Sequence, residues 1–497
     1  MNIIERIEHI AAEVPSKPAF ISRFGKITYG ELWDASGKLS AWIDKTQVDN
    51  KKPIIVYGHK SPWMPICFLA AVRSGRAYCP VDSSMPEERV LKIIDKVGNP
   101  LVLSTEPLEL ENAHLIDELK EIIKNQEIIS KDKWISGKDL FYVIFTSGST
   151  GLPKGVKITM DNLEGFTQWS RSLGRDLEEE ERIFLNQAPL SFDLSVMDIY
   201  TGLTSGSTIC SIDKELQQDN TEMLDYIKEN NVSCWVSTPS FADLAMTAPE
   251  FNDRNFPCIK NFFFCGEKLT VSTAKELRRR FPKSTVINTY GPTESTVAVT
   301  DVVIIDDMLE QKELPIGKTR PGTKIIIIDE NGNELPQGKA GEMLIIGDTV
   351  SPGYFEDDEK TKAVFGVNDK GERIYKTGDK GFYGKDGQLY ISGRIDLQIK
   401  FRGYRIELGD IEQNLLAMDM IKGACVVPKK RDGKIQQIAA FLVCEGIEGS
   451  FADRKMIRNF LKEKLPEYMV PKKLVFVDSI PMTDNGKIDR KKMEASL

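Results

Sequence analysis

An alternation of short apolar runs with helical patterns, extending from about residue 50 to residue 300, constrains the fold of this 497-residue chain more than any other feature. β-Branched runs at 53–58 and 232–238 each lie next to a segment with apolar residues at helical spacing, at 61–75 and 223–230. Strands and helices that alternate at this spacing form βαβ units on a parallel sheet. We therefore predict a fold of the α/β class.

The pattern changes between about residues 300 and 395. Apolar strands are separated there by turns, Asn-Gly at 331–332 and Asp-Gly at 386–387. These dipeptides favour the tight turns of β-hairpins. The segment is therefore predicted to be a compact β-rich subdomain.

A small α+β unit is predicted from about residue 396 to the end. It contains a helical pattern at 410–418, a hairpin pattern at 423–443 and a second helical pattern at 453–465. No low-complexity linker precedes it, so we expect a short hinge at the boundary. The predicted domains are 1–395 and 396–497.

Composition excludes several classes of function. The net charge of −8 argues against a protein that binds nucleic acid through a basic face. Only three histidines occur, at positions 9, 59 and 114, so catalysis later in the chain is expected to proceed without histidine. The eight cysteines form no C-x-x-C pair and are predicted to be reduced thiols. No apolar run reaches the roughly 18–20 residues that span a bilayer, and we expect a cytoplasmic protein without membrane insertion.

The first candidate motif is the loop F-T-S-G-S-T-G-L-P-K-G at 145–155, which directly follows an apolar strand. Glycines and hydroxyls allow backbone N–H groups to approach an anion closely, and a lysine adds positive charge. An ordinary Gly/Ser turn is the alternative. The candidate phosphate-binding residues are Thr146, Ser147, Gly148, Ser149, Thr150, Gly151 and Lys154.

The second motif, N-T-Y-G-P-T-E at 288–294, also follows an apolar run. Tyr290 offers a flat ring for a nucleotide base, and Glu294 is a hard oxygen ligand suited to Mg²⁺. A plain Gly-Pro turn is the alternative.

Two further motifs are weaker when taken alone. Asp379 in Y-K-T-G-D can accept hydrogen bonds from ribose hydroxyls, and Arg394 can pair with ribose or phosphate oxygens. A surface salt bridge is the alternative for this pair. Lys487 in N-G-K-I-D-R lies near a basic terminus, where a solvent-exposed lysine is the usual interpretation.

Together and in this order, the four motifs resemble those of the adenylate-forming superfamily, which includes acyl-CoA synthetases, firefly-type luciferases and the adenylation domains of nonribosomal peptide synthetases. The resemblance covers essentially the whole chain. It implies a large N-terminal domain of several sheets, a small mobile C-terminal domain and a hinge at Asp396. It also implies that Lys487 is the catalytic lysine and bridges the substrate carboxylate and the α-phosphate. By the same resemblance the ATP-binding residues include Asn288, Thr289, Tyr290, Gly291, Pro292, Thr293, Asp379, Ile391, Ser392, Gly393, Arg394 and Lys487.

This chemistry explains why histidine is not required. A carboxylate is already ionised at pH 7 and is already a nucleophile, so the reaction needs no general base. Its barrier lies in bringing two anions together, which cations and backbone N–H groups can offset. We therefore expect ATP and Mg²⁺ as cofactors.

The segment A-P-L-S-F-D-L-S-V-M-D at 188–198 bears on the substrate class. From the residues alone, Asp193 could pair with a substrate ammonium, or Asp193 or Ser191 could cap the following helix. In amino-acid-activating relatives an F-D-x-S aspartate binds the ammonium, and Asp193 matches it. The resemblance is strongest to members that activate D-alanine, which implies a side-chain pocket lined by Met197, Cys265 and Val297. Cys265 could crowd one configuration at Cα, or it could be a buried structural thiol.

The resemblance implies activation of D-alanine with ATP and its transfer to the phosphopantetheine thiol of a separate carrier protein, for D-alanylation of teichoic acid. The chain ends soon after Lys487 with no appended carrier module, so we expect the acceptor to be a separate protein or coenzyme A. We expect a monomer. Three alternatives remain: an adenylation enzyme for another small amino acid, an acyl-CoA synthetase, and an inactive nucleotide-binding protein.

Overall fold

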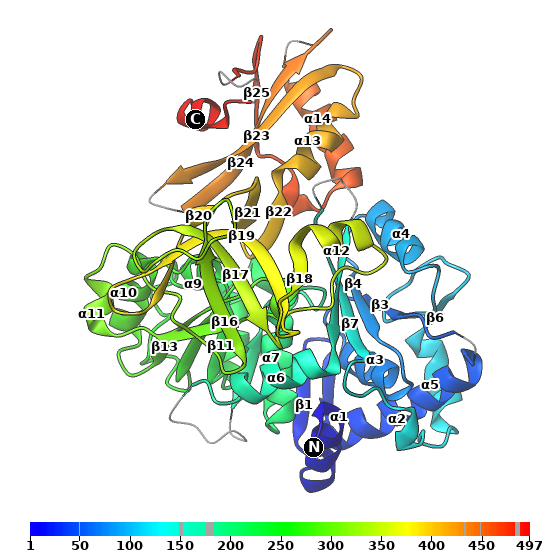
Figure 1. The fold of residues 1–497 in the computed structure, drawn as a ribbon. Coiled ribbons are helices and arrows are strands. Elements are labelled where there is room, and N and C mark those ends of the chain that lie inside the picture. Colours follow the sequence, from blue (N-terminus) through cyan, green and yellow to red (C-terminus); the bar gives the residue numbers. More distant parts are fainter. Residues whose placement is uncertain (49, 149–152, 175–181, 432–433, 448, 483–487) are drawn as a thin grey trace. The chain divides into compact units, whose positions relative to one another are not determined.

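The computed structural model describes residues 1–48, 50–148, 153–174, 182–431, 434–447, 449–482 and 488–497 (Figure 1). The chain divides into two compact units. The first contains residues 1–83, 97–144 and 155–395, and the second contains residues 84–96, 145–154 and 396–497. The α/β class and the combination of a large N-terminal part with a smaller C-terminal part are confirmed.

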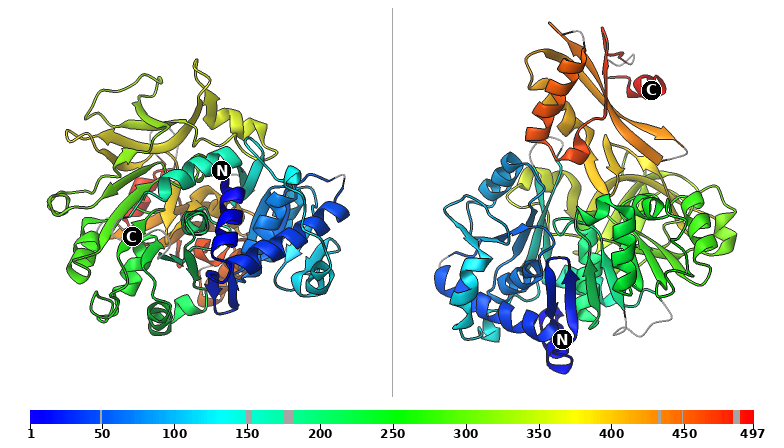
Figure 2. Two further views of the ribbon diagram at one scale, coloured as in Figure 1. Left: turned by 90° about the horizontal axis from the view of Figure 1, so that it is seen from below. Right: turned by 180° about the vertical axis from the view of Figure 1, so that it is seen from behind.

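The largest sheet has nine strands and is mainly parallel. Its strand order is β15-β14-β13-β12-β11-β9-β10-β1-β2. The central strands pair in parallel, whereas β14, β15 and β2 pair antiparallel at the two edges. Figure 2 shows this sheet mainly in green, with β1 and β2 in blue. The strands are β1 (Pro18–Ser22), β2 (Gly25–Thr28), β9 (Ile183–Asn186), β10 (Thr208–Ser211), β11 (Cys234–Ser237), β12 (Asn261–Phe264), β13 (Thr285–Tyr290), β14 (Thr300–Val303) and β15 (Lys318–Thr319).

A second sheet has the strand order β6-β5-β3-β4-β7-β8. Parallel pairing of β3 with both β4 and β5 confirms the βαβ prediction for the N-terminal part of the chain. The strands are β3 (Ile54–Gly58), β4 (Tyr78–Asp82), β5 (Val102–Ser104), β6 (Ala113–Leu115), β7 (Leu140–Thr146) and β8 (Lys154–Thr159).

The helices of the first unit bury apolar residues mainly against these two sheets, except for the last of them, which has no buried residue. They are α1 (Ile3–Glu13), α2 (Tyr29–Thr46), α3 (Trp63–Arg73), α5 (Ile116–Lys124), α6 (Met160–Ser170), α7 (Leu194–Thr204), α8 (Asn220–Glu229), α9 (Pro239–Ala245), α10 (Val271–Arg280), α11 (Asp306–Leu309) and α12 (Asp358–Val364). Capping boxes at Asn2, Thr28 and Thr159 define where α1, α2 and α6 begin. Helix α7 packs on β9 and β10 and against α6, and every residue of α7 is buried.

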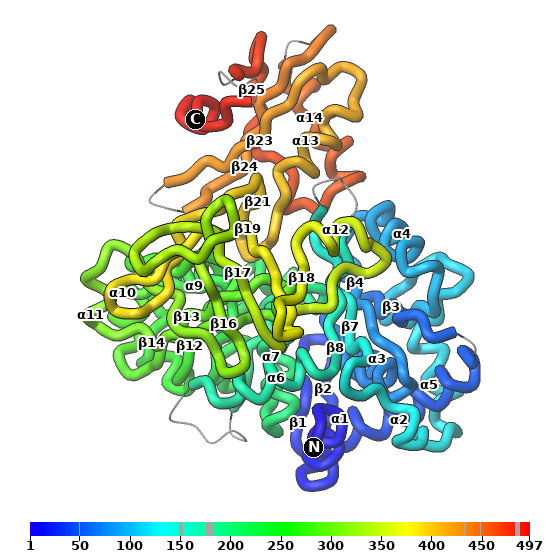
Figure 3. The backbone as a smooth tube through the Cα atoms, in the orientation of Figure 1, coloured from blue at the N-terminus to red at the C-terminus, as the bar shows by residue number. Residues whose placement is uncertain are grey.

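The β-rich subdomain is a five-stranded antiparallel sheet. It consists of β16 (Thr323–Ile328), β17 (Gly341–Gly347), β18 (Phe365–Val367), β19 (Arg373–Tyr383) and β20 (Leu389–Arg394). Figure 3 shows β16, β17, β19 and β18 side by side. The sheet begins at Thr323 and not near residue 300, because β14 and β15 continue the nine-stranded sheet.

The second unit contains the α+β segment predicted after residue 396. A sheet of β23 (Ile421–Arg431), β24 (Lys434–Cys444) and β25 (Lys473–Phe476) forms a core with α13 (Leu408–Leu416) and α14 (Phe451–Lys464). The unit also contains a hairpin of β21 (Gln398–Phe401) and β22 (Tyr404–Glu407), together with α4 (Glu87–Lys96) and α15 (Arg490–Ala495). Four 3-10 turns complete the described elements: η1 (Lys131–Lys133), η3 (Leu216–Gln218), η4 (Thr293–Ser295) and η5 (Glu467–Met469).

Two sequence predictions concern the chain as a whole. All eight cysteines are free, and six of them are buried, as predicted for reduced thiols. Among the described residues, no helix has the length and apolar character needed to cross a bilayer.

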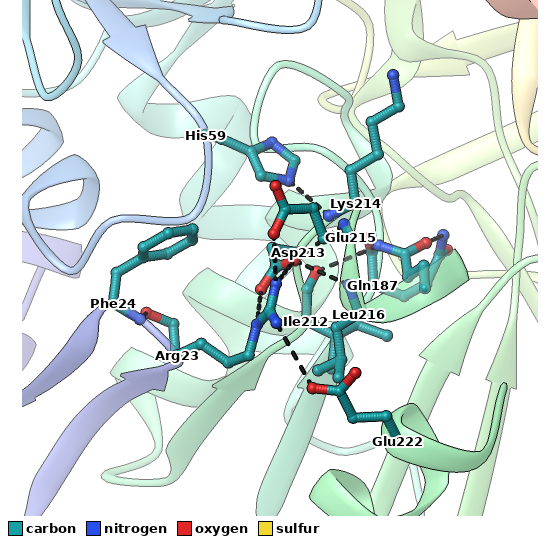
Figure 4. Close-up of polar contacts among 12 residues, drawn as sticks. Arg23, Phe24, His59, Gln187, Ile212, Asp213, Lys214, Glu215, Leu216 and Glu222 are labelled. Carbon is teal, nitrogen blue, oxygen red and sulfur yellow. Dashed lines mark hydrogen bonds and ion pairs between the residues drawn. The ribbon is translucent and has the colours of Figure 1, made fainter. Parts of the chain in front are cut away.

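A polar cluster joins the ends of the two large sheets in the first unit (Figure 4). His59, directly after β3, lies 2.8 Å from Asp82 through Nδ1, and its Nε2 accepts a hydrogen bond from the Lys214 N–H at 3.0 Å. Beside it, Arg23 pairs with Asp213 through two hydrogen bonds of 2.6 and 2.7 Å. Side chains at the ends of four strands, β1, β3, β4 and β10, therefore take part in this cluster, and the hydrogen bond between His59 and Lys214 connects the two sheets.

The Asp213 carboxylate is expected to stabilise the fold in a pH-dependent way. Burial opposes its ionisation, but hydrogen bonds from Arg23 and the backbone N–H groups of Leu216 and Glu215 outweigh burial and lower the pKa of Asp213. A lowered pKa contributes stability above the unfolded-state value, and this stability is lost as the pH falls through the folded-state value. Asp213→Asn should therefore reduce the free energy of unfolding by about 1–3 kcal/mol at pH 7 and by less near pH 3, below the unfolded-state pKa.

Urea unfolding at the two pH values measures this difference. The matched control is Glu215→Gln, because Glu215 also contacts Arg23 but its side chain is 85% exposed. The control should change the unfolding free energy by less than about 0.5 kcal/mol. An equal loss in both variants, or a loss independent of pH, would contradict the assignment.

Candidate functional site

Asp193 occupies the N-cap position of α7 without capping the helix. Its backbone is helical, with φ −64° and ψ −24°, and its side chain makes no cap hydrogen bond. The buried Ser191 hydroxyl also has no hydrogen-bond partner among the described residues. The helix-capping interpretation of this segment is therefore wrong for both side chains.

Tyr142 on β7 lies within electrostatic range of Asp193. Its buried hydroxyl has no hydrogen-bond partner among the described residues. Burial raises the pKa of Tyr142 well above its ordinary value, and the charges of Tyr78 and Asp193 add to this effect. Sequence reasoning missed Tyr142, although it precedes the 145–155 loop by only three residues.

The three predicted pocket residues belong to one apolar cluster. Met197, Cys265 and Val297 are each at most 3% exposed. The Cys265 thiol lies 3.7 Å from the Val297 carbonyl oxygen, which places these two residues in direct contact. All three residues therefore belong to the apolar core of the first unit.

The backbone beside Cys265 is strained. Thr296 and Val297 have φ angles of +62° and +68°, a left-handed conformation that β-branched residues rarely adopt. The Thr296 hydroxyl donates to the Thr349 carbonyl at 2.8 Å, and the segment approaches Gly291 so closely that a Cβ there would lie 2.6 Å from the Ala298 Cα. Strain of this kind is typical of functional sites and was not predicted from the sequence.

Tyr290, Asp379 and Arg394 form one buried hydrogen-bonded group. The Tyr290 hydroxyl donates to Asp379 Oδ2 at 2.6 Å, and Arg394 pairs with Asp379 Oδ1 at 2.6 Å. Asp379 is 4% exposed, so the alternative of a surface salt bridge is wrong. Burial and the Asp379 charge raise the pKa of Tyr290 well above its ordinary value, so the hydroxyl stays protonated.

The side chains of Asn288 and Thr289, which precede Tyr290, form hydrogen bonds with backbone carbonyl groups. Asn288 donates to the Pro315 carbonyl at 2.8 Å, and the Thr289 hydroxyl donates to the Phe264 carbonyl at 2.9 Å. On β20, Ser392 and Gly393 are exposed and Ile391 is half-buried. Strands β19 and β20 pair so that Asp379 lies opposite Arg394.

Glu294 is completely buried in η4, between Thr293 and Ser295. Its Oε1 accepts a hydrogen bond of 2.9 Å from the Tyr354 hydroxyl. Among the described residues, no group of three or more His, Cys, Asp or Glu side chains could enclose a metal. Mg²⁺ commonly binds one or two carboxylates together with phosphate oxygens, so a single glutamate fits this ion only in the presence of nucleotide.

The structure describes only part of the 145–155 loop, because Ser149, Thr150 and Gly151 lie outside the described residues. In the second unit, the Ser147 hydroxyl donates to the Arg405 carbonyl at 2.7 Å, and the Lys154 ammonium lies 3.8 Å from Glu407. The buried Thr146 hydroxyl has no hydrogen-bond partner among the described residues, which leaves a polar group available at the start of the loop.

The remaining two predicted positions are the hinge and the catalytic lysine. The compact units divide between Ile395 and Asp396, and the Asp396 carboxylate accepts a hydrogen bond of 3.2 Å from the Gln398 N–H. Lys487 lies outside the described residues.

Comparison with known proteins identifies the family. A model described as "AMP-binding enzyme" matches residues 7–355, and one described as "AMP-binding enzyme C-terminal domain" matches residues 410–487. The chain therefore belongs to the AMP-binding enzyme family, and it is an adenylate-forming enzyme as the motifs predict.

Two relatives are similar to the chain over its full length. The chain is 42% identical over 506 residues to a D-alanine–D-alanyl carrier protein ligase of Bacillus licheniformis, covering 100% of both chains. It is also 42% identical to a ligase of the same name from Bacillus cereus, covering 99% of both chains.

Solved structures agree with the fold. PA1221, an NRPS protein containing adenylation and PCP domains, matches with a TM-score of 0.86 and 26% identity over 100% of this chain and 84% of that chain. AlmE, an adenylation domain of Vibrio cholerae in complex with glycyl-adenosine-5′-phosphate, matches with a TM-score of 0.85 and 22% identity over 99% of this chain and 97% of that chain.

Proposed function

We propose that this enzyme activates D-alanine with ATP and transfers the D-alanyl group to the phosphopantetheine thiol of a carrier protein. The observation that carries this proposal is full-length similarity to two D-alanine–D-alanyl carrier protein ligases. Asp193 agrees with it, since this position binds the substrate ammonium in amino-acid-activating relatives and an acyl-CoA synthetase has no substrate ammonium to bind. We further propose that the product serves D-alanylation of teichoic acid.

The first step joins two anions. A D-alanine carboxylate oxygen attacks the α-phosphorus of ATP, the bond to the departing pyrophosphate breaks, and D-alanyl-AMP forms. In this proposal Asp193 binds the substrate ammonium, and Lys487 offsets the charge of the carboxylate and α-phosphate. Bound at Glu294, Mg²⁺ would neutralise phosphate charge.

The nucleotide is proposed to be held by the motifs described above. The Tyr290 ring would stack on adenine, while Asp379, oriented by Arg394 and by the Tyr290 hydroxyl, would accept hydrogen bonds from the ribose. Loop residues 146–151 and Lys154 would bind the phosphates through N–H groups and positive charge.

The second step is thioester formation. The carrier thiol attacks the carbonyl carbon of D-alanyl-AMP, the bond to AMP breaks, and the thiol loses its proton. We propose domains at 1–395 and 396–497, with Asp396 as the pivot that allows one C-terminal domain to serve both steps.

ATP–pyrophosphate exchange with separate D- and L-amino acids and a fatty acid tests the proposal. D-Alanine should give the highest kcat/KM, with glycine within about 200-fold because a lost methyl group provides limited discrimination. Exchange that depends on another amino acid or on a fatty acid would overturn the substrate assignment. Absence of exchange with every acid would overturn the enzymatic assignment.

Cys265→Ala should weaken selection for D-alanine. The buried thiol lies beside the Val297 carbonyl. In this proposal it limits the space around the substrate Cα, and a smaller residue should admit L-alanine. We expect the D/L ratio of kcat/KM to fall about tenfold. Cys258→Ala is the matched control, because its half-buried thiol contacts Asn231 outside the pocket. An unchanged ratio in Cys265→Ala would exclude a stereochemical role.

A further inference from the structure

A fully buried lysine contacts the segment that carries the proposed ammonium ligand. Lys60 follows β3 by two residues and is 0% exposed. Its ammonium donates to Asn186 Oδ1 at 2.6 Å and to the Ala188 carbonyl at 2.5 Å. These two acceptors lie at the start of the segment 186–198, which contains Asp193 and Met197.

Asn186 connects Lys60 to the far end of the same segment. Its amide nitrogen donates to Asp198 Oδ1 on α7 at 2.8 Å, and its amide oxygen also accepts from the Ser211 hydroxyl at 2.7 Å. The segment begins with Asn186 at the end of β9. Asp198, twelve residues later, accepts a hydrogen bond from the Asn186 side chain. Asp193 and Met197 lie between these two hydrogen-bonded residues in the sequence.

Lys60 is not suited to a purely packing role, because its surroundings disfavour the charged form of the side chain. Burial lowers the pKa of Lys60 to about 8, against the opposing attraction of Asp198, Asp82 and Asp213. Asp198 is also 0% exposed, and its Oδ2 has no hydrogen-bond partner among the described residues. A buried charged group lowers stability unless it is hydrogen-bonded, so the two specific hydrogen bonds of Lys60 are the more informative feature.

We propose that Lys60 is a positioning residue of the amino-acid site, which acts by holding segment 186–198 so that Asp193 and Met197 face the substrate correctly. Lys60 itself need not touch the substrate. This inference rests on the proposed function, because it uses the role of Asp193 in binding the ammonium.

Steady-state ATP–pyrophosphate exchange on the full chain tests the inference. In Lys60→Met the segment loses two hydrogen bonds, so the KM for D-alanine should rise about ten- to a hundredfold while the KM for ATP changes less than about twofold. Asn186→Ala removes the shared acceptor and should produce the same selective change. It also provides a second test if Lys60→Met does not fold.

The matched control is Arg73→Met, which removes another fully buried cation. Arg73 on α3 donates to the Trp33 carbonyl at 2.6 Å and to the Ser36 hydroxyl at 2.7 Å, away from segment 186–198. It should lower the melting temperature without raising the KM for D-alanine. A normal KM for D-alanine in folded Lys60→Met or Asn186→Ala, or an equal rise in Arg73→Met, would overturn the inference. Lack of D-alanine-dependent exchange in the wild type would instead overturn the proposed function.

Discussion

Asp193→Asn is expected to lose D-alanine activation by about 10²–10³-fold in kcat/KM, because the substrate ammonium would be desolvated without a countercharge. Asparagine keeps the shape of the side chain and is as good a helix cap as aspartate. A capping residue would therefore tolerate this change, whereas an ammonium ligand would not. The absence of a cap hydrogen bond from Asp193 favours the larger effect.

The readout is ATP–pyrophosphate exchange as a function of D-alanine concentration, combined with thermal unfolding and ATP binding. Unchanged unfolding and ATP binding would locate the defect at the amino-acid site. Near-normal kcat/KM in Asp193→Asn would show that the charge is not used and would remove the argument that Asp193 provides against a substrate without an amino group.

Lys487→Ala is expected to reduce formation of the adenylate by at least about 10²–10³-fold, the usual effect of removing one group that stabilises transition-state charge. The lysine is the only proposed side-chain cation between the carboxylate and the α-phosphate. Because the substrate supplies its own nucleophile, the loss should appear mainly in kcat at saturating D-alanine and ATP.

A second assay and a control make this test specific. Transfer from chemically prepared D-alanyl-AMP to the carrier bypasses adenylate formation and should retain most of its rate in Lys487→Ala. The control is Lys491→Ala, which removes an exposed lysine on α15 and should leave both reactions unchanged. Full exchange activity in Lys487→Ala would exclude the catalytic role.

The sheets were predictable because their signal is local. The apolar runs at 53–58 and 232–238 form the buried strands β3 and β11, and the helical patterns beside them form α3 and α8. The start of the β-rich subdomain was misplaced because β14 resembles a hairpin strand in sequence. It pairs antiparallel with β13 and belongs to the nine-stranded sheet, where it lies between β13 and β15, and local periodicity does not specify which sheet a strand joins.

The candidate site was predictable only in part. Its motifs identified Asp379, Arg394 and Tyr290 separately, but a sequence spacing of 89 residues between Tyr290 and Asp379 does not indicate a hydrogen bond. The strained backbone at Thr296 and Val297 opposes the local preference of β-branched residues, so no propensity rule predicts it. Surrounding contacts impose this conformation.

The alternation of strands with helices already indicated the α/β class, and the resemblance of the four ordered motifs to a known family implied an adenylate-forming enzyme, whose substrate supplies the nucleophile and which therefore needs no histidine. These properties reside in residue identity and short-range spacing. The partners of the buried charges came only from tertiary structure: Asp379 with Tyr290 and Arg394, and Lys60 with Asn186 across 126 residues. A buried polar group must find a partner wherever the folded chain provides one, and that choice depends on packing in three dimensions.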